Sequence, residues 1–153
     1  MSPLHLQGRT IALVAAGGLV GAPARYAISG ALPSSGSGFP TATFVTNLTG
    51  ALALGLLLEV LARRGPDEGT RRSVRLLVGT GILGAYTTYS TFSVDTDQLL
   101  RSHRVGLAIA YALGSVVLGV VATGVGVAVG ARHHRGGPGV TDAGVDPDLE
   151  GGR

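Results

Sequence analysis

The stretch from Gly84 to Ser93 reads GAYTTYSTFS and carries a hydroxyl on five Ser or Thr residues and on two tyrosines. It lies inside a run without charged side chains, where burying an unpaired polar group costs about 2–7 kcal/mol. An isolated Thr or Ser meets this cost by donating to the backbone carbonyl one helical turn earlier. So dense a cluster instead indicates hydroxyls that line an ion path or surround an ion.

Other polar side chains stand along the remaining apolar runs. Asn47 lies far from either end of its run, and an interhelical hydrogen bond or a ligand contact would account for it equally well. Arg25 fits an anchor at the membrane interface better than a ligand-binding group. Tyr111 and Ser115 are one helical turn apart, a spacing that simple packing also explains. Together these groups offer hydrogen-bond donors without a central carboxylate, which favours an anion as ligand.

Helical spacing predicts two neighbouring stripes in the hydroxyl-rich stretch. Gly81 and Gly84 precede both stripes and weaken helix propensity, so the sequence predicts a helix break here. A break would free backbone carbonyls, which suit a hard cation. One predicted stripe holds Thr87, Ser90, Thr91 and Val94, and the other holds Tyr86, Tyr89 and Phe92.

The elements that position these residues must lie in a membrane. The 153-residue chain is 45% hydrophobic and only 14% charged, and its mean hydropathy is +0.40. A helix needs roughly 20 residues to cross the hydrocarbon core, and four runs are long enough. We therefore predict an all-α integral membrane protein with one domain, residues 1–131, of four transmembrane helices with a break in the third. The predicted spans are residues 10–32, 39–62, 75–95 and 104–131.

Composition argues against several classes of function. The chain has no cysteine, so disulfides and thiolate metal sites are excluded. The apolar runs hold no carboxylate pair, nucleophile–base set or metal-ligand cluster, so we expect that this chain is not an enzyme. The basic residues are all arginines, mostly at the ends of the runs, which indicates membrane anchoring rather than nucleic-acid binding. Residues 132–153 are rich in Gly, Pro and Asp and predict a disordered tail.

Small residues recur at four-residue spacing within the predicted spans. Helices in lipid associate by close backbone packing, so this spacing predicts helix–helix contact faces. The faces occur on several sides of the spans, which favours an oligomer. They are Gly17/Gly21, Ala51/Gly55, Gly106/Ala110/Gly114 and Gly126/Gly130.

The arginines are distributed unequally between the two sides of the predicted bundle. With four spans, both termini and the 63–75 loop share one side, which then carries nine arginines against three on the other. Positive charge is retained in the cytoplasm during insertion. We therefore predict that both termini are cytoplasmic.

Three stretches resemble the signature sequences of the CrcB/Fluc fluoride channel family in order and spacing. They are GGLVGAPARYAIS, FVTNLTGALALGLL and GAYTTYSTFS, and the resemblance extends from about Gly17 to Ser115. It implies a multi-pass protein of a bacterial cell membrane that forms an antiparallel, dual-topology dimer with two pores. Fluoride would leave the cell through these pores passively, which reduces its toxicity.

The resemblance also implies roles for individual residues. Gly84 and Thr87 match the residues whose backbone carbonyls hold a structural sodium ion, Na+, on the dimer axis. Arg25 matches a basic residue near the vestibule. The residues implied to line or adjoin the fluoride path are Asn47, Thr88, Tyr89, Ser90, Thr91, Phe92, Tyr111 and Ser115.

Two features depart from the family pattern. Tyr89 stands where the family usually has Phe, and the arginines are too unequal for a chain that inserts in both orientations. The second departure indicates one half of a heterodimer, paired with an oppositely oriented paralogue. Two alternatives remain: a small dual-topology multidrug exporter, although the embedded glutamate of such exporters is missing, and a non-transporting membrane scaffold.

Overall fold

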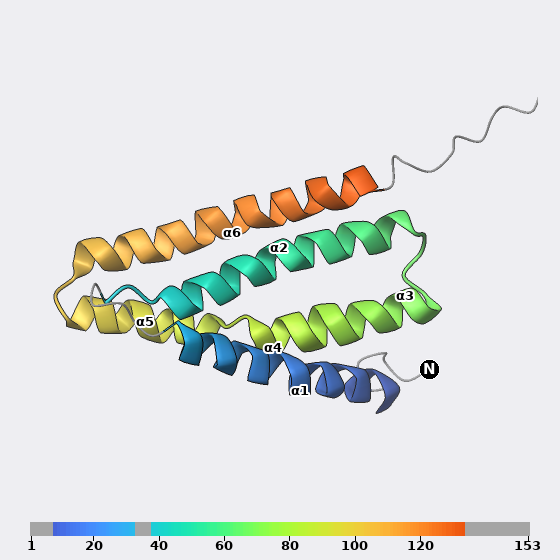
Figure 1. The fold of residues 1–153 in the computed structure, drawn as a ribbon, viewed down its shortest axis with the longest axis horizontal. Helices are drawn as coiled ribbons and strands as arrows, with labels where there is room; N and C mark the ends of the chain where they lie inside the picture. The colour runs from blue at the N-terminus through green and yellow to red at the C-terminus, as the bar shows by residue number, and fades with distance from the viewer. Residues whose placement is uncertain (1–7, 33–37, 134–153) are drawn as a thin grey trace, which may run out of the picture.

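The chain folds into an elongated bundle of helices that lie side by side (Figure 1). The structure is a computed structural model, and it describes residues 8–32 and 38–133. Within these residues every regular element is helical, as the sequence predicts. The elements are α1 (Gly8–Ala31), α2 (Thr41–Arg63), α3 (Gly69–Val74), η2 (Arg75–Leu83), α4 (Gly84–Tyr86), α5 (Tyr89–Arg101) and α6 (Val105–His133).

Three stretches of helix are long and apolar enough to cross a membrane, namely Gly8–Ala31, Thr41–Arg63 and Val105–Arg132. They coincide with the first, second and fourth predicted spans to within a few residues. Helix α6 continues through His133, so the tail predicted from residue 132 starts too early by two residues. The rest of that predicted tail, residues 134–153, lies outside the described residues.

The third predicted span is a series of segments rather than one helix. The chain is π-helical over η2, forms one α-helical turn in α4 and then becomes extended at Thr87 (ψ 159°) and Thr88 (φ −149°, ψ 122°). The predicted break is therefore present. The two predicted helical stripes are wrong, because the extended residues separate Tyr86 and Thr87 from the residues of α5. The π-helix, a rare conformation often found at functional sites, was not predicted.

Backbone contact at glycines brings α1 against η2. A Cβ atom at Gly17 or Gly21 would overlap the carbonyl oxygen of Leu77 or Ile82, and a Cβ at Gly81 would lie 2.8 Å from the Cα of Gly17. Only glycine allows so close an approach. The predicted contact face on the first span is thus confirmed.

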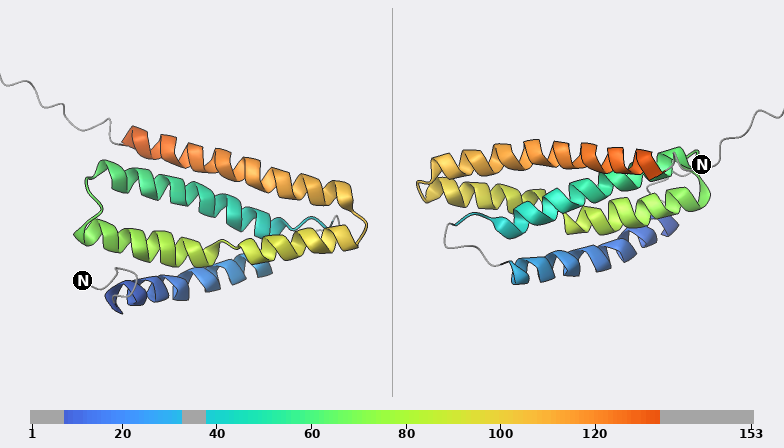
Figure 2. Two further views of the ribbon diagram at one scale, coloured as in Figure 1. Left: turned by 180° about the vertical axis from the view of Figure 1, so that it is seen from behind. Right: turned by 45° about the horizontal axis from the view of Figure 1, so that its top comes forward.

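Helix α6 packs along α2 through a second glycine-lined contact (Figures 1 and 2). Gly55 approaches the backbone of Thr123, Gly126 approaches that of Leu52, and Gly130 packs on the side chain of Glu59. These predicted faces are also confirmed. By contrast, no described atom lies close to a Cβ built at either Gly106 or Gly114, so that predicted face is open in the single chain.

The start of α1, the end of α6 and the α2–α3 connection lie at one end of the bundle (Figure 1). Two arginines hold this connection. Arg75 donates to Asp67 through two nitrogens, the shorter contact being 2.6 Å. Arg71 donates to the carbonyl of Pro66 at 3.0 Å. The hydrogen bond from Arg75 keeps the pKa of the exposed Asp67 below its usual value. This arrangement of the start of α1, the end of α6 and the loop is consistent with the prediction that the termini and the 63–75 loop lie on one side of the membrane.

Candidate functional site

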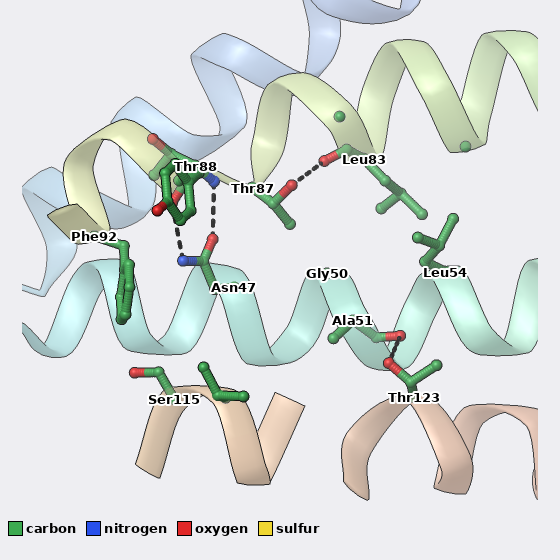
Figure 3. Close-up of a pocket in the computed structure, with 14 residues that line it drawn as sticks. Asn47, Gly50, Ala51, Leu54, Leu83, Thr87, Thr88, Phe92, Ser115 and Thr123 are labelled. Carbon is green, nitrogen blue, oxygen red and sulfur yellow. Dashed lines mark hydrogen bonds between the residues drawn. The ribbon is translucent and has the colours of Figure 1, made fainter. Parts of the chain in front are cut away.

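The side chain of Asn47, on α2, pairs with both backbone polar groups of Thr88 at the break (Figure 3). Asn47 Nδ2 donates to the Thr88 carbonyl at 3.0 Å, and the Thr88 N–H donates to Asn47 Oδ1 at 2.8 Å. Thr88 is outside the helices, so its backbone N–H and C=O lack helical partners. The Asn47 amide supplies a hydrogen-bond partner for each of them. Asn47 thereby joins α2 to the break across 41 residues of sequence.

The side chain of Thr88 starts helix α5. Its Oγ1 accepts a hydrogen bond from the N–H of Thr91 at 3.1 Å, which is the usual N-cap interaction. It also lies 3.0 Å from Thr91 Oγ1 and 3.2 Å from Ser90 Oγ. Thr88 is only 8% exposed. The hydroxyls of this cluster therefore bond chiefly to one another and to the helix start.

These bonds divert two backbone donors from their ordinary acceptors. In a continuous α-helix, the N–H of Thr88 would donate to the carbonyl of Gly84, and that of Thr91 to the carbonyl of Thr87. Here the first donates to Asn47 Oδ1 and the second to Thr88 Oγ1. The carbonyls of Gly84 and Thr87 therefore lose their helical donors, and both belong to the residues predicted to hold sodium.

A cavity of about 430 Å³ opens between α2, α6 and the broken span (Figure 3). It brings together seven of the predicted site residues. It is mainly apolar, and among the described residues that line it none is charged. The lining residues are Asn47, Gly50, Ala51, Leu54, Gly79, Leu83, Gly84, Thr87, Thr88, Tyr89, Phe92, Ser115, Val116 and Thr123.

Three side chains give this cavity its chemistry. Ser115 Oγ is buried and has no hydrogen-bond partner within the described residues. The amide nitrogen of Asn47 has two hydrogens, of which the Thr88 carbonyl takes one. The ring of Phe92 lies beside Asn47 (Figure 3), and aromatic edges carry partial positive charge. The cavity thus presents weak donors without a carboxylate, an arrangement suited to a small anion.

Arg25 lies apart from this cavity, on a second one of about 230 Å³. Thr88 lines both cavities, so the break stands between them. Arg25 is half-buried there, and its vestibule and anchor roles both stay predictions. The smaller cavity is lined by Ala22, Arg25, Tyr26, Ser29, Thr43, Thr46, Thr88 and Thr91.

Two predicted site residues line neither of these cavities. Ser90 is exposed and lies against Thr88. Tyr111 is 1% exposed, and its hydroxyl donates to Asp95 Oδ2 over 3.4 Å. Its ring packs against Phe92, with centroids 5.3 Å apart. Tyr111 therefore reaches the larger cavity only through Phe92.

Several lining residues were not foreseen from the sequence. Thr123 lies eight residues after Ser115 on α6, and its Oγ1 donates to the Gly119 carbonyl at 3.0 Å. Eight residues place two side chains about 80° apart around the helix, within the width of one broad face, so this spacing was a weak signal. The small and apolar lining residues gave no such signal, because their role is to leave space.

Comparison with known proteins identifies the family. The sequence profile of the CrcB-like protein family, also described as Camphor Resistance (CrcB), matches residues 12–127. The chain belongs to the CrcB-like family. The resemblance seen in the three sequence stretches is thus confirmed over most of the chain.

Individual members of the CrcB-like family agree with this result. The chain is 50% identical over 129 residues to "Fluoride-specific ion channel FluC 2" of Leifsonia xyli subsp. xyli, covering 84% of this chain and 88% of that protein. It is 45% identical over 111 residues to "Fluoride-specific ion channel FluC 1" of Cutibacterium acnes, covering 72% and 78%. These relatives are named as channels, which agrees with the expectation that the CrcB-like chain is not an enzyme.

Proposed function

We propose that this chain is a fluoride-selective ion channel that lets fluoride leave the bacterial cytoplasm passively. The observation that carries the proposal is the cavity where Asn47, Phe92 and Ser115 meet at the helix break. Membership of a family whose relatives are named fluoride-specific channels supports the choice of ion. Three long apolar helices support a location in the cell membrane.

Fluoride is small and heavily hydrated, so its passage requires donors that replace water without trapping the ion. The hydroxyl of Ser115, which has no partner in the part of the chain that the structure describes, and the remaining N–H of Asn47 would supply such donors, and the ring of Phe92 a weaker attraction. Tyr89 is 82% exposed and its ring is 6.1 Å from that of Phe92. Tyr89, at a position where the family usually has Phe, would extend the aromatic surface formed by Phe92.

A structural sodium ion is part of the proposal. The carbonyls of Gly84 and Thr87 fit a hard cation, because the two donors that would satisfy them in a helix bond elsewhere. Among the described residues no group of three His, Cys, Asp or Glu side chains is placed to bind a metal. The ion would neutralise exposed backbone dipoles at the break, and fluoride would not pass through it.

We further propose that the chain works as an antiparallel dimer, paired with an oppositely oriented paralogue. Gly84, Tyr89 and Ser90 are exposed in the single chain, so a second subunit has room to cover the break. The arginine bias favours one orientation with cytoplasmic termini. The numbered names of the relatives, FluC 1 and FluC 2, agree with genomes that hold more than one such chain.

The direct test is fluoride efflux from liposomes that contain this chain alone, followed with a fluoride electrode, with chloride as the control ion. Rapid release of fluoride but not chloride from this chain alone would establish a homodimeric channel and overturn the heterodimer. Release only after co-expression with a paralogue of opposite charge bias would establish the heterodimer. No fluoride release in either preparation would overturn the channel proposal and leave the scaffold as the better explanation.

A further inference from the structure

We infer that Asn47 is a positioning residue for the sodium-binding carbonyls, in addition to any contact it makes with fluoride. This inference rests on the proposed sodium site and deepens it. Asn47 would thus connect the pore to the ion that stabilises the dimer. The juxtaposition that carries it is the double hydrogen bond between the Asn47 amide and the backbone of Thr88.

The first step concerns the carbonyl of Gly84. Its helical donor is the N–H of Thr88, and that N–H lies 2.8 Å from Asn47 Oδ1. The Thr88 N–H has a single hydrogen, and because that hydrogen points at Asn47 it cannot also bond to the Gly84 carbonyl. The Asn47 side chain therefore substitutes for the Gly84 carbonyl as acceptor and leaves that oxygen available to a cation.

The second step concerns the direction of the Thr87 carbonyl. This carbonyl and the N–H of Thr88 belong to one peptide unit, which is trans, so the two groups point in opposite directions. Because the N–H is held towards Asn47 on α2, the Thr87 carbonyl is held away from α2. The second bond, from Asn47 Nδ2 to the Thr88 carbonyl at 3.0 Å, fixes the following peptide as well.

The third step completes the pair of carbonyls. Thr88 Oγ1 takes the N–H of Thr91 at 3.1 Å, which would otherwise bond to the Thr87 carbonyl. Asn47 and the Thr88 hydroxyl thus each release one of the two carbonyls. Because each side chain releases a different carbonyl, removing either one alone should weaken sodium binding.

The test follows sodium binding through the shift of the thermal unfolding midpoint of the purified channel in detergent, prepared in the form that releases fluoride, alone or with the co-expressed paralogue. Sodium chloride is titrated against N-methyl-D-glucamine chloride at constant ionic strength, because a ligand that binds only the folded state raises the midpoint. The variants are Asn47→Leu, Asn47→Asp and Thr88→Val. Thr96→Val is the matched control, since the Thr96 hydroxyl bonds within its own helix, to the Phe92 carbonyl at 2.8 Å.

We expect Asn47→Leu and Thr88→Val to weaken the apparent sodium affinity by about tenfold, the equivalent of one net hydrogen bond. Asn47→Asp keeps an acceptor for the Thr88 N–H and should retain sodium binding. It should still lose fluoride efflux, because it loses the N–H donors and adds a negative charge. This separation of sodium binding from fluoride efflux distinguishes a positioning residue from a simple pore donor.

Wild-type sodium affinity in both Asn47→Leu and Thr88→Val would overturn the inference, whatever the fluoride efflux of those variants. If the wild type gains no stability from sodium, the sodium site and the inference both fail, and the fluoride efflux of the wild type still decides the channel proposal. Should Asn47→Leu not fold, Thr88→Val and Asn47→Asp carry the test. Amide hydrogen exchange of wild-type Thr88 provides a further check, since fast exchange would contradict the bond to Asn47.

Discussion

The ring of Tyr111 packs against the ring of Phe92 and does not itself line the large cavity. Their centroids are 5.3 Å apart with planes inclined at 38°, and Phe39 packs edge-on against Tyr111 at 5.5 Å. Tyr111 is almost fully buried together with Leu99 and Ala108. Phe92 therefore has a fixed orientation at the cavity, which a ring exposed to lipid would not have.

Replacing Tyr111 should separate this support from the chemistry of its hydroxyl. Tyr111→Ala should lower the free energy of unfolding by about 3–5 kcal/mol and reduce fluoride efflux, because Phe92 loses its backing. Tyr111→Phe keeps the ring and loses the hydroxyl with its 3.4 Å bond to Asp95 and its hydrogen bond with Thr43, so it should cost about 1–2 kcal/mol. Thermal unfolding in detergent and liposome efflux measure both effects. A Tyr111→Phe variant as damaged as Tyr111→Ala would contradict the packing role.

Ser115 should be important for transport and unimportant for stability. Its buried hydroxyl has no partner within the described residues, so Ser115→Ala removes no hydrogen bond of the fold and should leave the unfolding midpoint unchanged or slightly higher. Fluoride efflux should fall several-fold, because a donor to the dehydrated ion is lost. Ser93→Ala is the control: the exposed Ser93 hydroxyl bonds to the Tyr89 carbonyl at 3.0 Å. Equal efflux from wild type and Ser115→Ala would remove Ser115 from the fluoride path.

The two aromatic positions should respond differently to substitution. Phe92→Ile removes the aromatic ring that lines the cavity with Asn47 and should lower fluoride efflux by at least about tenfold, which corresponds to 1.4 kcal/mol. Tyr89→Phe keeps the ring and should preserve efflux to within about threefold, because the aromatic surface of Tyr89 is unchanged. Initial efflux rates at matched protein density give the comparison. Normal efflux from Phe92→Ile would favour a scaffold over a pore.

The glycines between α1 and η2 should tolerate no side chain. A methyl group at Gly17 would overlap the backbone of Leu77 and lie 2.7 Å from the Cα of Gly81, so Gly17→Ala should destabilise the protein by about 1–3 kcal/mol. At Gly119 no described atom lies within 4 Å of an added Cβ, and Gly119→Ala should be neutral or stabilising by up to about 1 kcal/mol. Unfolding midpoints of the two variants test this. Similar midpoints would argue against close contact of α1 with η2.

Much of the architecture was predictable because it depends on local properties. The length of an apolar run decides whether a helix can span a membrane, and this located α1, α2 and α6 to within a few residues. Glycines at four-residue spacing identified Gly17/Gly21 and Gly126/Gly130 as contact faces, and the structure places the first against η2 and the second against α2. The same pattern could not show that Gly106 and Gly114 face no neighbour, because spacing specifies a face and not what covers it.

The sequence by itself determined which chemical groups this protein places within its membrane spans, namely an amide, hydroxyls and aromatic rings without a central carboxylate. Only the tertiary structure decided how they are used. The predicted stripes assumed helical spacing across the break, whereas Asn47 on α2 bonds to the backbone of Thr88, where the chain is extended. That bond joins residues 41 positions apart, and no local pattern can specify a partner at such a distance. It decides which carbonyls lose their helical donors, and the packing of the helices places Asn47, Phe92 and Ser115 on one cavity, with Tyr111 packed against Phe92.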